Sequence, residues 1–219
     1  MNYGVHPLAS LLAAVARGIT GVQVQWAGCE PDEKQRIYFA NHTSHLDFVV
    51  LWSALPSDLR ARTRPVAAQD YWESSLLRRY FVSNVFNAVL VQRGVTAQTK
   101  SREEARFAGR ALIEQLASAL GDQYSLILFP EGTRGNGERV EPFRAGLYYL
   151  ALRRPDVELV PAYLENMNRI LPKGEVLPVP MLSLLTFGKP LQVEPGEEKE
   201  AFLERAREAV SSLRRIGNA

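Results

Sequence analysis

A histidine and an aspartate five residues apart are the first pair in this sequence that could do acid–base chemistry. His42 and Asp47 lie in the run Asn41-His42-Thr43-Ser44-His45-Leu46-Asp47, between an apolar strand-like segment and an apolar helical one. On one continuous helix, residues five apart point about 140° away from each other, so the pair could not meet there. A helix that begins near Ser44 leaves His42 at the strand-to-helix corner, within reach of the carboxylate. The two residues then form a general-base dyad, in which the aspartate fixes the imidazole tautomer.

The same segment also has a purely structural interpretation. Ser44-x-x-Asp47 fits a capping box, which would explain the serine and the aspartate without any catalysis. His45 fits a structural histidine equally well. The residues of this segment alone leave both interpretations open.

A second group of chemically capable residues follows another strand-like segment. It reads Phe129-Pro130-Glu131-Gly132-Thr133-Arg134-Gly135, at the end of the apolar run 125–129, where α/β sheets commonly bind ligands. Gly132 lets the backbone approach an anion, Thr133 adds a hydroxyl donor and Arg134 adds a planar fork that suits phosphate. The structural alternative is a turn with a solvated salt bridge between Glu131 and Arg134.

Alternating strand-like and helical segments predict the scaffold that positions these residues. We expect an α/β fold, with one central, mostly parallel or mixed sheet flanked by helices in a single domain. The expected strands are 22–26, 36–40, 65–68, 88–91, 125–129, 158–164 and 182–187. The expected helices are 7–20, 47–55, 73–83, 99–120, 145–153 and 197–214. The proline-rich segment 166–181 is expected to be a loop.

The N-terminal segment, residues 1–24, is set apart from a main domain of residues 25–219 by its pattern. Leu8, Leu11, Leu12, Val15, Ile19 and Val22 recur at helical spacing after Pro7. The stripe is too short for a membrane-spanning helix, which needs about 20 apolar residues. It could lie in a membrane interface or pack as a core helix, and the pattern leaves both open.

Composition excludes several classes of protein. With 219 residues, 46% of them hydrophobic and 23% charged, the chain is neither disordered nor fibrous. A net charge of +2 gives no reason to expect nucleic-acid binding. One cysteine, Cys29, allows no intrachain disulfide, and three histidines form no metal motif, so we expect a metal-free protein without a cofactor in a reducing cytoplasm.

Taken in order along the chain, these motifs resemble those of the glycerolipid acyltransferases typified by bacterial lysophosphatidate acyltransferase. The resemblance rests on His42-x4-Asp47 followed by Phe-Pro-Glu-Gly-Thr-Arg, and it runs from about residue 20 to residue 190. Further matching blocks are Val91-Gln92-Arg93, Phe143-Arg144-Ala145-Gly146 and Val160-Pro161-Ala162. Gln92 stands where an acidic residue is frequent and Gly135 where serine is frequent, and these two departures concern acceptor specificity rather than the reaction class.

The resemblance implies a role for each motif residue. His42 would be the base and Asp47 its orienting partner. Glu131, Gly132 and Thr133 would belong to the acceptor site, and Arg93 and Arg134 would contact the acceptor phosphate. Arg144 is a weaker candidate for phosphate or carrier contact.

The resemblance also implies the reaction. A fatty acyl group would pass from acyl-CoA or acyl carrier protein to a lysophospholipid hydroxyl, most simply turning lysophosphatidate into phosphatidate at the inner face of the cell membrane. The acyl donor is a co-substrate, and no cofactor is implied. The alternatives are an acceptor with another headgroup, a catalytically idle lipid-phosphate binding module, and a thioesterase or lipase that uses water. No Gly-x-Ser-x-Gly elbow is present, which counts against the hydrolase route.

Overall fold

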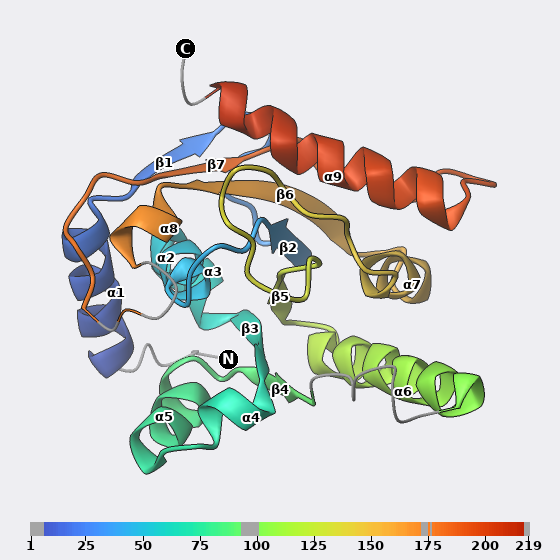
Figure 1. Cartoon of the computed structure of the whole chain (residues 1–219), viewed down its shortest axis with the longest axis horizontal. Coiled ribbons are helices and arrows are strands. Elements are labelled where there is room, and N and C mark those ends of the chain that lie inside the picture. The colour runs from blue at the N-terminus through green and yellow to red at the C-terminus, as the bar shows by residue number, and fades with distance from the viewer. Residues whose placement is uncertain (1–6, 93–100, 172–174, 176, 217–219) are drawn as a thin grey trace.

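The centre of the molecule is a twisted mixed sheet. The computed structural model describes residues 7–92, 101–171, 175 and 177–216. Within these residues the sheet has seven strands in the order β1-β7-β6-β2-β5-β3-β4 (Figure 1). The strands are β1 Gln23–Trp26, β2 Arg36–Ala40, β3 Thr63–Ala68, β4 Val89–Val91, β5 Ser125–Leu128, β6 Glu158–Glu165 and β7 Leu184–Phe187.

Strand direction decides which loops meet. The strands β2, β3, β4, β5 and β6 pair in parallel, β7 runs antiparallel to β6, and β1 runs parallel to β7. The expectation of an α/β fold with a mostly parallel or mixed sheet is therefore confirmed. Because the five parallel strands end on the same side, the segments that follow β2 and β5 leave the sheet together.

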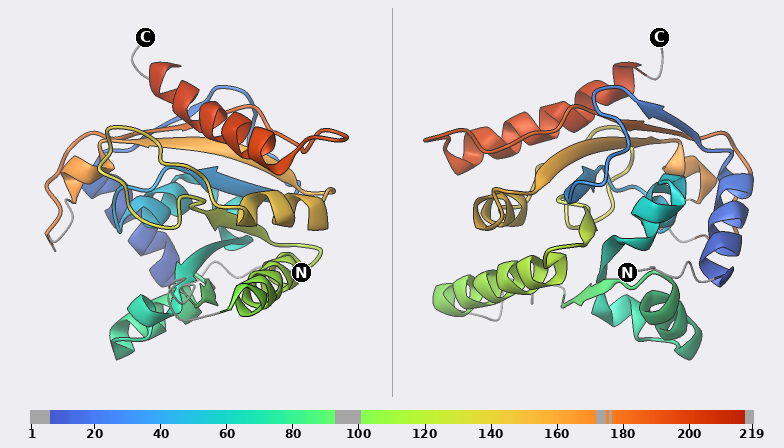
Figure 2. Two further views of the ribbon diagram at one scale, coloured as in Figure 1. Left: turned by 45° about the vertical axis from the view of Figure 1, so that its right-hand side comes forward. Right: turned by 180° about the vertical axis from the view of Figure 1, so that it is seen from behind.

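Helices cover both faces of this sheet. They are α1 Pro7–Thr20, α2 Asp47–Ala54, α3 Ser57–Ala61, α4 Gln69–Trp72, α5 Leu76–Tyr80, the π-helix η1 Phe81–Val85, α6 Arg102–Leu120, α7 Gly146–Arg153, α8 Met167–Ile170 and α9 Lys199–Ile216. One face carries α6, α7 and α9, and the other carries α1, α2 and α3 (Figures 1 and 2). Strand β2 serves both layers: Ile37 and Phe39 join the first core, and Tyr38 joins the second.

Sequence patterns located the strands and the long helices and missed the short helices. Helices α3 and α4 were not predicted, and the segment expected as a loop over 166–181 contains the one-turn helix α8. The single helix expected over 73–83 is instead α5 followed by the π-helix η1. Helix α2, Asp47–Ala54, matches the helix expected over 47–55, and a turn at 44–46 stands where the dyad argument places the start of a helix near Ser44. These differences arise from tertiary contacts, which periodicity over four or five residues cannot report.

The two faces of α1 differ in their surroundings. Ala9, Ala13 and Ala16 are buried, and α1 packs against α2. Leu11 and Val15 are exposed by 60% and 47%. The alanine face of α1 therefore packs in the core, and contact of the other face with a membrane stays a prediction. No described helix is long and apolar enough to cross a membrane.

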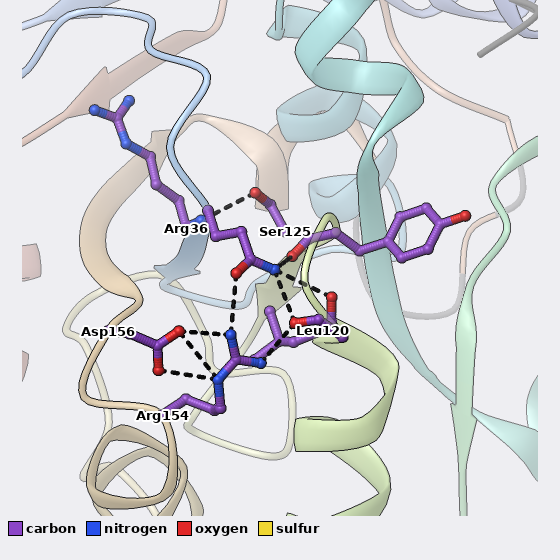
Figure 3. A network of polar contacts seen from close by, with 8 residues as sticks. Arg36, Leu120, Ser125, Arg154 and Asp156 are labelled. Carbon is purple, nitrogen blue, oxygen red and sulfur yellow. Dashed lines mark hydrogen bonds and ion pairs between the residues drawn. The ribbon is translucent and has the colours of Figure 1, made fainter. Parts of the chain in front are cut away.

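The end of the sheet where β2 and β5 begin is fixed by a polar network (Figure 3). The Gln35 amide donates to three backbone carbonyls near the end of α6, those of Leu120, Gly121 and Tyr124. Arg154 donates to Gln35 Oε1 at 3.0 Å and pairs with Asp156 at 2.6 Å. These contacts tie α6 and α7 to the starts of β2 and β5. The motif residues gather at the opposite end of the sheet, where β2 and β5 finish.

Candidate active site

The two motifs meet because β2 and β5 are parallel neighbours. Phe39 in β2 is in register with Leu128 in β5. Residues 41–47, the catalytic turn, follow β2, and residues 129–137, the glutamate loop, follow β5. Gly135 in the glutamate loop donates its backbone N–H to the His42 carbonyl at 2.8 Å. The loops therefore touch directly, although they are far apart in the sequence.

His42 and Asp47 form the contact expected of a dyad. His42 Nδ1 lies 2.8 Å from Asp47 Oδ2, and the aspartate side chain is fully buried. Because a carboxylate accepts, Nδ1 carries the hydrogen and Nε2 keeps its lone pair. Nε2 is therefore the nitrogen that can take a proton from a substrate.

The same aspartate oxygen also organises the backbone of the catalytic turn. Asp47 Oδ2 accepts the N–H groups of Thr43 at 2.6 Å and Ser44 at 2.8 Å. Only half of a capping box forms, because Ser44 Oγ accepts from Leu46 N and donates to the Leu171 carbonyl. Asp47 thus shapes the turn and contacts the histidine ring at once, and the general-base role of the pair stays a prediction.

The His42 ring lies against an aromatic side chain. It stacks on Phe129 with ring centroids 4.5 Å apart and planes inclined by 24°. The histidine side chain remains 23% exposed. Stacking and the aspartate contact fix the ring from two directions and leave part of it open to a substrate.

Glu131 uses both carboxylate oxygens on backbone groups. Oε1 accepts the His42 N–H at 2.6 Å, and Oε2 accepts the Glu141 N–H at 3.1 Å. The residue is 4% exposed. Burial raises the pKa of its carboxyl, and the two N–H donors oppose that shift. In this geometry the side chain positions His42.

Gly132 and Arg144 are matched to each other. Gly132 has a φ of +70°, and a Cβ at this position would stand 2.3 Å from Arg144 Nε. Arg144 Nε donates to the Glu131 carbonyl at 3.2 Å, and Arg144 N donates to the Pro130 carbonyl at 2.8 Å. Glycine is required here both for the left-handed backbone and for the close approach of the arginine. Arg144 therefore braces the glutamate loop.

Of the two arginines expected to contact the acceptor phosphate, Arg134 lies within the residues that the structure describes. Its guanidinium makes no hydrogen bond or ion pair with any described residue. The salt bridge between Glu131 and Arg134, which was the structural alternative for this loop, therefore does not form, since both Glu131 oxygens accept from backbone donors. Thr133 beside it is exposed. Arg93 lies outside the described residues, two positions after β4 ends at Val91.

Three residues near the dyad make structural contacts that were not predicted from the sequence. Phe129 supports the His42 ring. Asn41 bonds with both its amide atoms to the backbone of Leu164 in β6, at 2.9 and 2.8 Å, and so extends the sheet up to the dyad. Tyr71 in α4 stacks on His45 with centroids 4.6 Å apart. Each of these tasks depends on a partner at least 26 positions away, so no local spacing could have revealed it.

The described residues offer little to a metal ion. No group of three or more histidine, cysteine, aspartate or glutamate side chains with suitable placement occurs among them. Cys29 packs at the edge of the core that contains α1 and α2. A reaction without a metal or cofactor stays a prediction.

Comparison with known proteins gives the motifs a family context. Residues 22–165 match the family model described as Acyltransferase. The chain is 30% identical over 166 residues to a 1-acyl-sn-glycerol-3-phosphate acyltransferase of Limnanthes douglasii, which covers 74% of this chain and 53% of that relative. It is 23% identical over 168 residues to the alpha form of that enzyme from Mus musculus, covering 75% and 53%. The chain therefore spans about half the length of the curated relatives it matches.

A solved structure shares the fold. The crystal structure of PlsC, the 1-acyl-sn-glycerophosphate acyltransferase of Thermotoga maritima, superposes with a TM-score of 0.71 over 97% of this chain and 80% of that chain. Sequence identity over the match is 20%, so the likeness speaks for the fold.

Proposed function

The chain belongs to the acyltransferase family, and we propose that it transfers a fatty acyl group from a thioester donor to the free hydroxyl of a lysophospholipid. Lysophosphatidate is the acceptor that the relatives favour, because the similar plant and mouse proteins are 1-acyl-sn-glycerol-3-phosphate acyltransferases. The donor is acyl-CoA or acyl carrier protein, and no cofactor takes part. The lipid acceptor makes the inner face of the cell membrane the proposed place of action.

The observation that carries this proposal is the 2.8 Å contact between His42 Nδ1 and the buried Asp47 Oδ2. It leaves Nε2 free to take the proton of the acceptor hydroxyl. The acceptor oxygen then attacks the thioester carbonyl carbon, and the tetrahedral intermediate collapses with cleavage of the carbon–sulfur bond. The proton held on Nε2 passes to the departing thiolate, which leaves as a thiol.

Asp47 stabilises this cycle electrostatically. When His42 carries the extra proton, the buried carboxylate lies in contact with the new positive charge. The Glu131 carboxylate bonds to the backbone of the same histidine and lowers the cost of that charge further. Arg134, without an ion-pair partner among the described residues, is the group proposed to meet the acceptor phosphate, with Arg93 as its proposed helper.

Thiol release measured with and without an acceptor tests the proposal. The purified chain is given acyl-CoA or acyl carrier protein together with lysophosphatidate, a lysolipid of another headgroup, or no acceptor. We expect thiol release that depends on lysophosphatidate and yields phosphatidate in equal amount. Equal release without an acceptor would indicate a thioesterase, and lysolipid binding without release would indicate an idle binding module.

A further inference from the structure

Helix α5 presents two adjacent leucines to solvent. Leu76 is 84% exposed and Leu77 is 66% exposed, and Tyr80 at the end of the helix is 45% exposed. Single exposed leucines are common on protein surfaces, but neighbouring large apolar side chains on one projecting helix indicate a contact surface. Neither leucine belongs to the two core clusters of the described residues, and Tyr80 contacts the neighbouring Phe81 ring edge to face with centroids 5.9 Å apart.

The structure holds α5 outward from both ends. After the helix, Val82 and Val85 of η1 are buried. Before it, Trp72 of α4 packs edge to face against Phe48 with ring centroids 5.5 Å apart. Because both flanking segments are anchored in the core, the exposure of α5 follows from its place in the fold.

The charges on α5 are complementary to an anionic surface. Its last turn contains Arg78 and Arg79, both exposed, and its first turn contains no acidic residue. Segments that bind a membrane interface combine leucines, which enter the acyl layer, with tyrosines at the interface and arginines that contact phosphate headgroups. Helix α5 has this composition.

A stack of side chains connects α5 to the catalytic turn. The Arg78 guanidinium lies 4.4 Å from the Tyr71 ring centroid, and Tyr71 stacks on His45 at 4.6 Å with planes inclined by 13°. His45 is three residues from His42. A surface that α5 touches is therefore adjacent in structure to the proposed site of acyl transfer.

We propose that α5 docks this protein onto a phospholipid bilayer, with Leu76 and Leu77 among the acyl chains and Arg79 at anionic headgroups. The purpose of this contact rests on the proposed function, since a lysolipid acceptor must leave a membrane to reach His42. Helix α1, with exposed Leu11 and Val15, lies toward the same end of the molecule, and α7 lies toward the other (Figures 1 and 2).

Vesicle sedimentation of the full chain tests the docking surface. The vesicles contain either phosphatidylcholine alone or a mixture with phosphatidylglycerol. The variants are Leu76→Ser with Leu77→Ser, and Arg79→Glu. The matched controls are Leu152→Ser, at a residue 51% exposed on α7, and Arg106→Glu, at an exposed arginine on α6. Thermal unfolding checks that each variant folds.

We expect the double leucine variant to lower the vesicle partition coefficient at least about tenfold on both vesicles. Arg79→Glu should weaken binding mainly to the phosphatidylglycerol vesicles, while both controls bind as wild type. Activity separates docking from catalysis: the leucine variant should lose turnover of lysophosphatidate in vesicles and keep turnover of a water-soluble short-chain analogue.

Vesicle binding by the leucine variant at the wild-type level would overturn the proposal. A change in its oligomeric mass without a change in vesicle binding would assign α5 to a protein contact and overturn it equally. Absence of turnover by the wild-type protein on every acceptor would count against the proposed function alone, because sedimentation measures docking without any reaction.

Discussion

Glu131 Oε1 lies 2.6 Å from the backbone nitrogen of His42, a contact between residues 89 positions apart. The other carboxylate oxygen accepts the N–H of Glu141 at 3.1 Å. Because both oxygens serve backbone donors in a buried setting, the carboxylate joins the catalytic turn to the glutamate loop. The position of the His42 ring therefore depends on a residue that does not touch the ring.

Glu131→Gln should lower kcat by about 10- to 100-fold while the protein stays folded. A glutamine amide offers one acceptor and one donor, so one of the two backbone N–H groups must face an NH₂ group. The turn then shifts, and His42 shifts with it. Steady-state kinetics on lysophosphatidate give kcat and KM, and Glu103→Gln on the exposed face of α6 is the matched control.

The same kinetics distinguish positioning from acceptor binding by Glu131. A positioning role lowers kcat and leaves the acceptor KM nearly unchanged. If Glu131→Gln instead raised the acceptor KM alone, the carboxylate would be contacting substrate, as the family resemblance implies, and the positioning role would be refuted.

The raised pKa of Glu131 also predicts a pH dependence of stability. Burial places the folded-state pKa above the ordinary 4.5. Between the two values the folded protein binds more protons than the unfolded chain, so stability falls as pH rises through that window. The free energy of unfolding of wild type minus that of Glu131→Gln should therefore decrease from about pH 4 to pH 7. An increase over this range would show that the N–H donors outweigh burial.

The contact between His42 and Asp47 was predictable because its determinants are local. His42, Asp47 and the end of an apolar strand lie within a dozen residues, and a turn was the only geometry that let them meet. The task of Glu131 was not predictable, because its partners come from another strand loop and from Glu141. The long elements followed from periodicity, whereas α8 follows Asn166 in a left-handed conformation that no apolar pattern reports.

His42→Ala should reduce acyl transfer by a factor of about 10³ or more without unfolding the protein. Asp47 keeps its backbone bonds to Thr43 and Ser44 in this variant, so the turn survives. Asp47→Asn should cost activity comparably and some stability as well, since those bonds lose their charged acceptor. His45→Ala removes the stack on Tyr71 and leaves the contact between His42 and Asp47 in place, so its effect should be milder. A folded His42→Ala protein with near-normal turnover would exclude the general-base mechanism.

Serine substitutions in two pairs of residues on α1 should differ in their effects on vesicle binding and on stability. Leu11→Ser with Val15→Ser alters exposed side chains and should leave the melting temperature nearly unchanged while weakening vesicle binding. Leu8→Ser with Leu12→Ser alters partly buried side chains that pack on the core, and should cost about 1–3 kcal/mol of unfolding free energy. Calorimetry and vesicle sedimentation measure both effects. Unchanged sedimentation of the first pair would remove α1 from the membrane contact.

Arg134→Ala should weaken kcat/KM for lysophosphatidate by about 10- to 100-fold, the loss expected for one charge-assisted contact of about 1.5–3 kcal/mol. Stability should not change, because Arg134 has no ion-pair partner among the described residues. Arg134→Lys keeps the charge and loses the planar fork, so its activity should lie between that of wild type and that of Arg134→Ala.

The comparison of acceptors decides what Arg134 recognises. If it contacts the acceptor phosphate, the alanine variant should lose far more activity on lysophosphatidate than on a neutral monoacylglycerol, and the preference between the two should narrow. Arg144→Ala is the informative contrast, since Arg144 braces the glutamate loop through the Glu131 carbonyl and should affect both acceptors alike. Equal proportional losses for Arg134→Ala on both acceptors would mean that this arginine serves the loop or the thioester donor, and phosphate recognition would have to be sought elsewhere, beginning with Arg93.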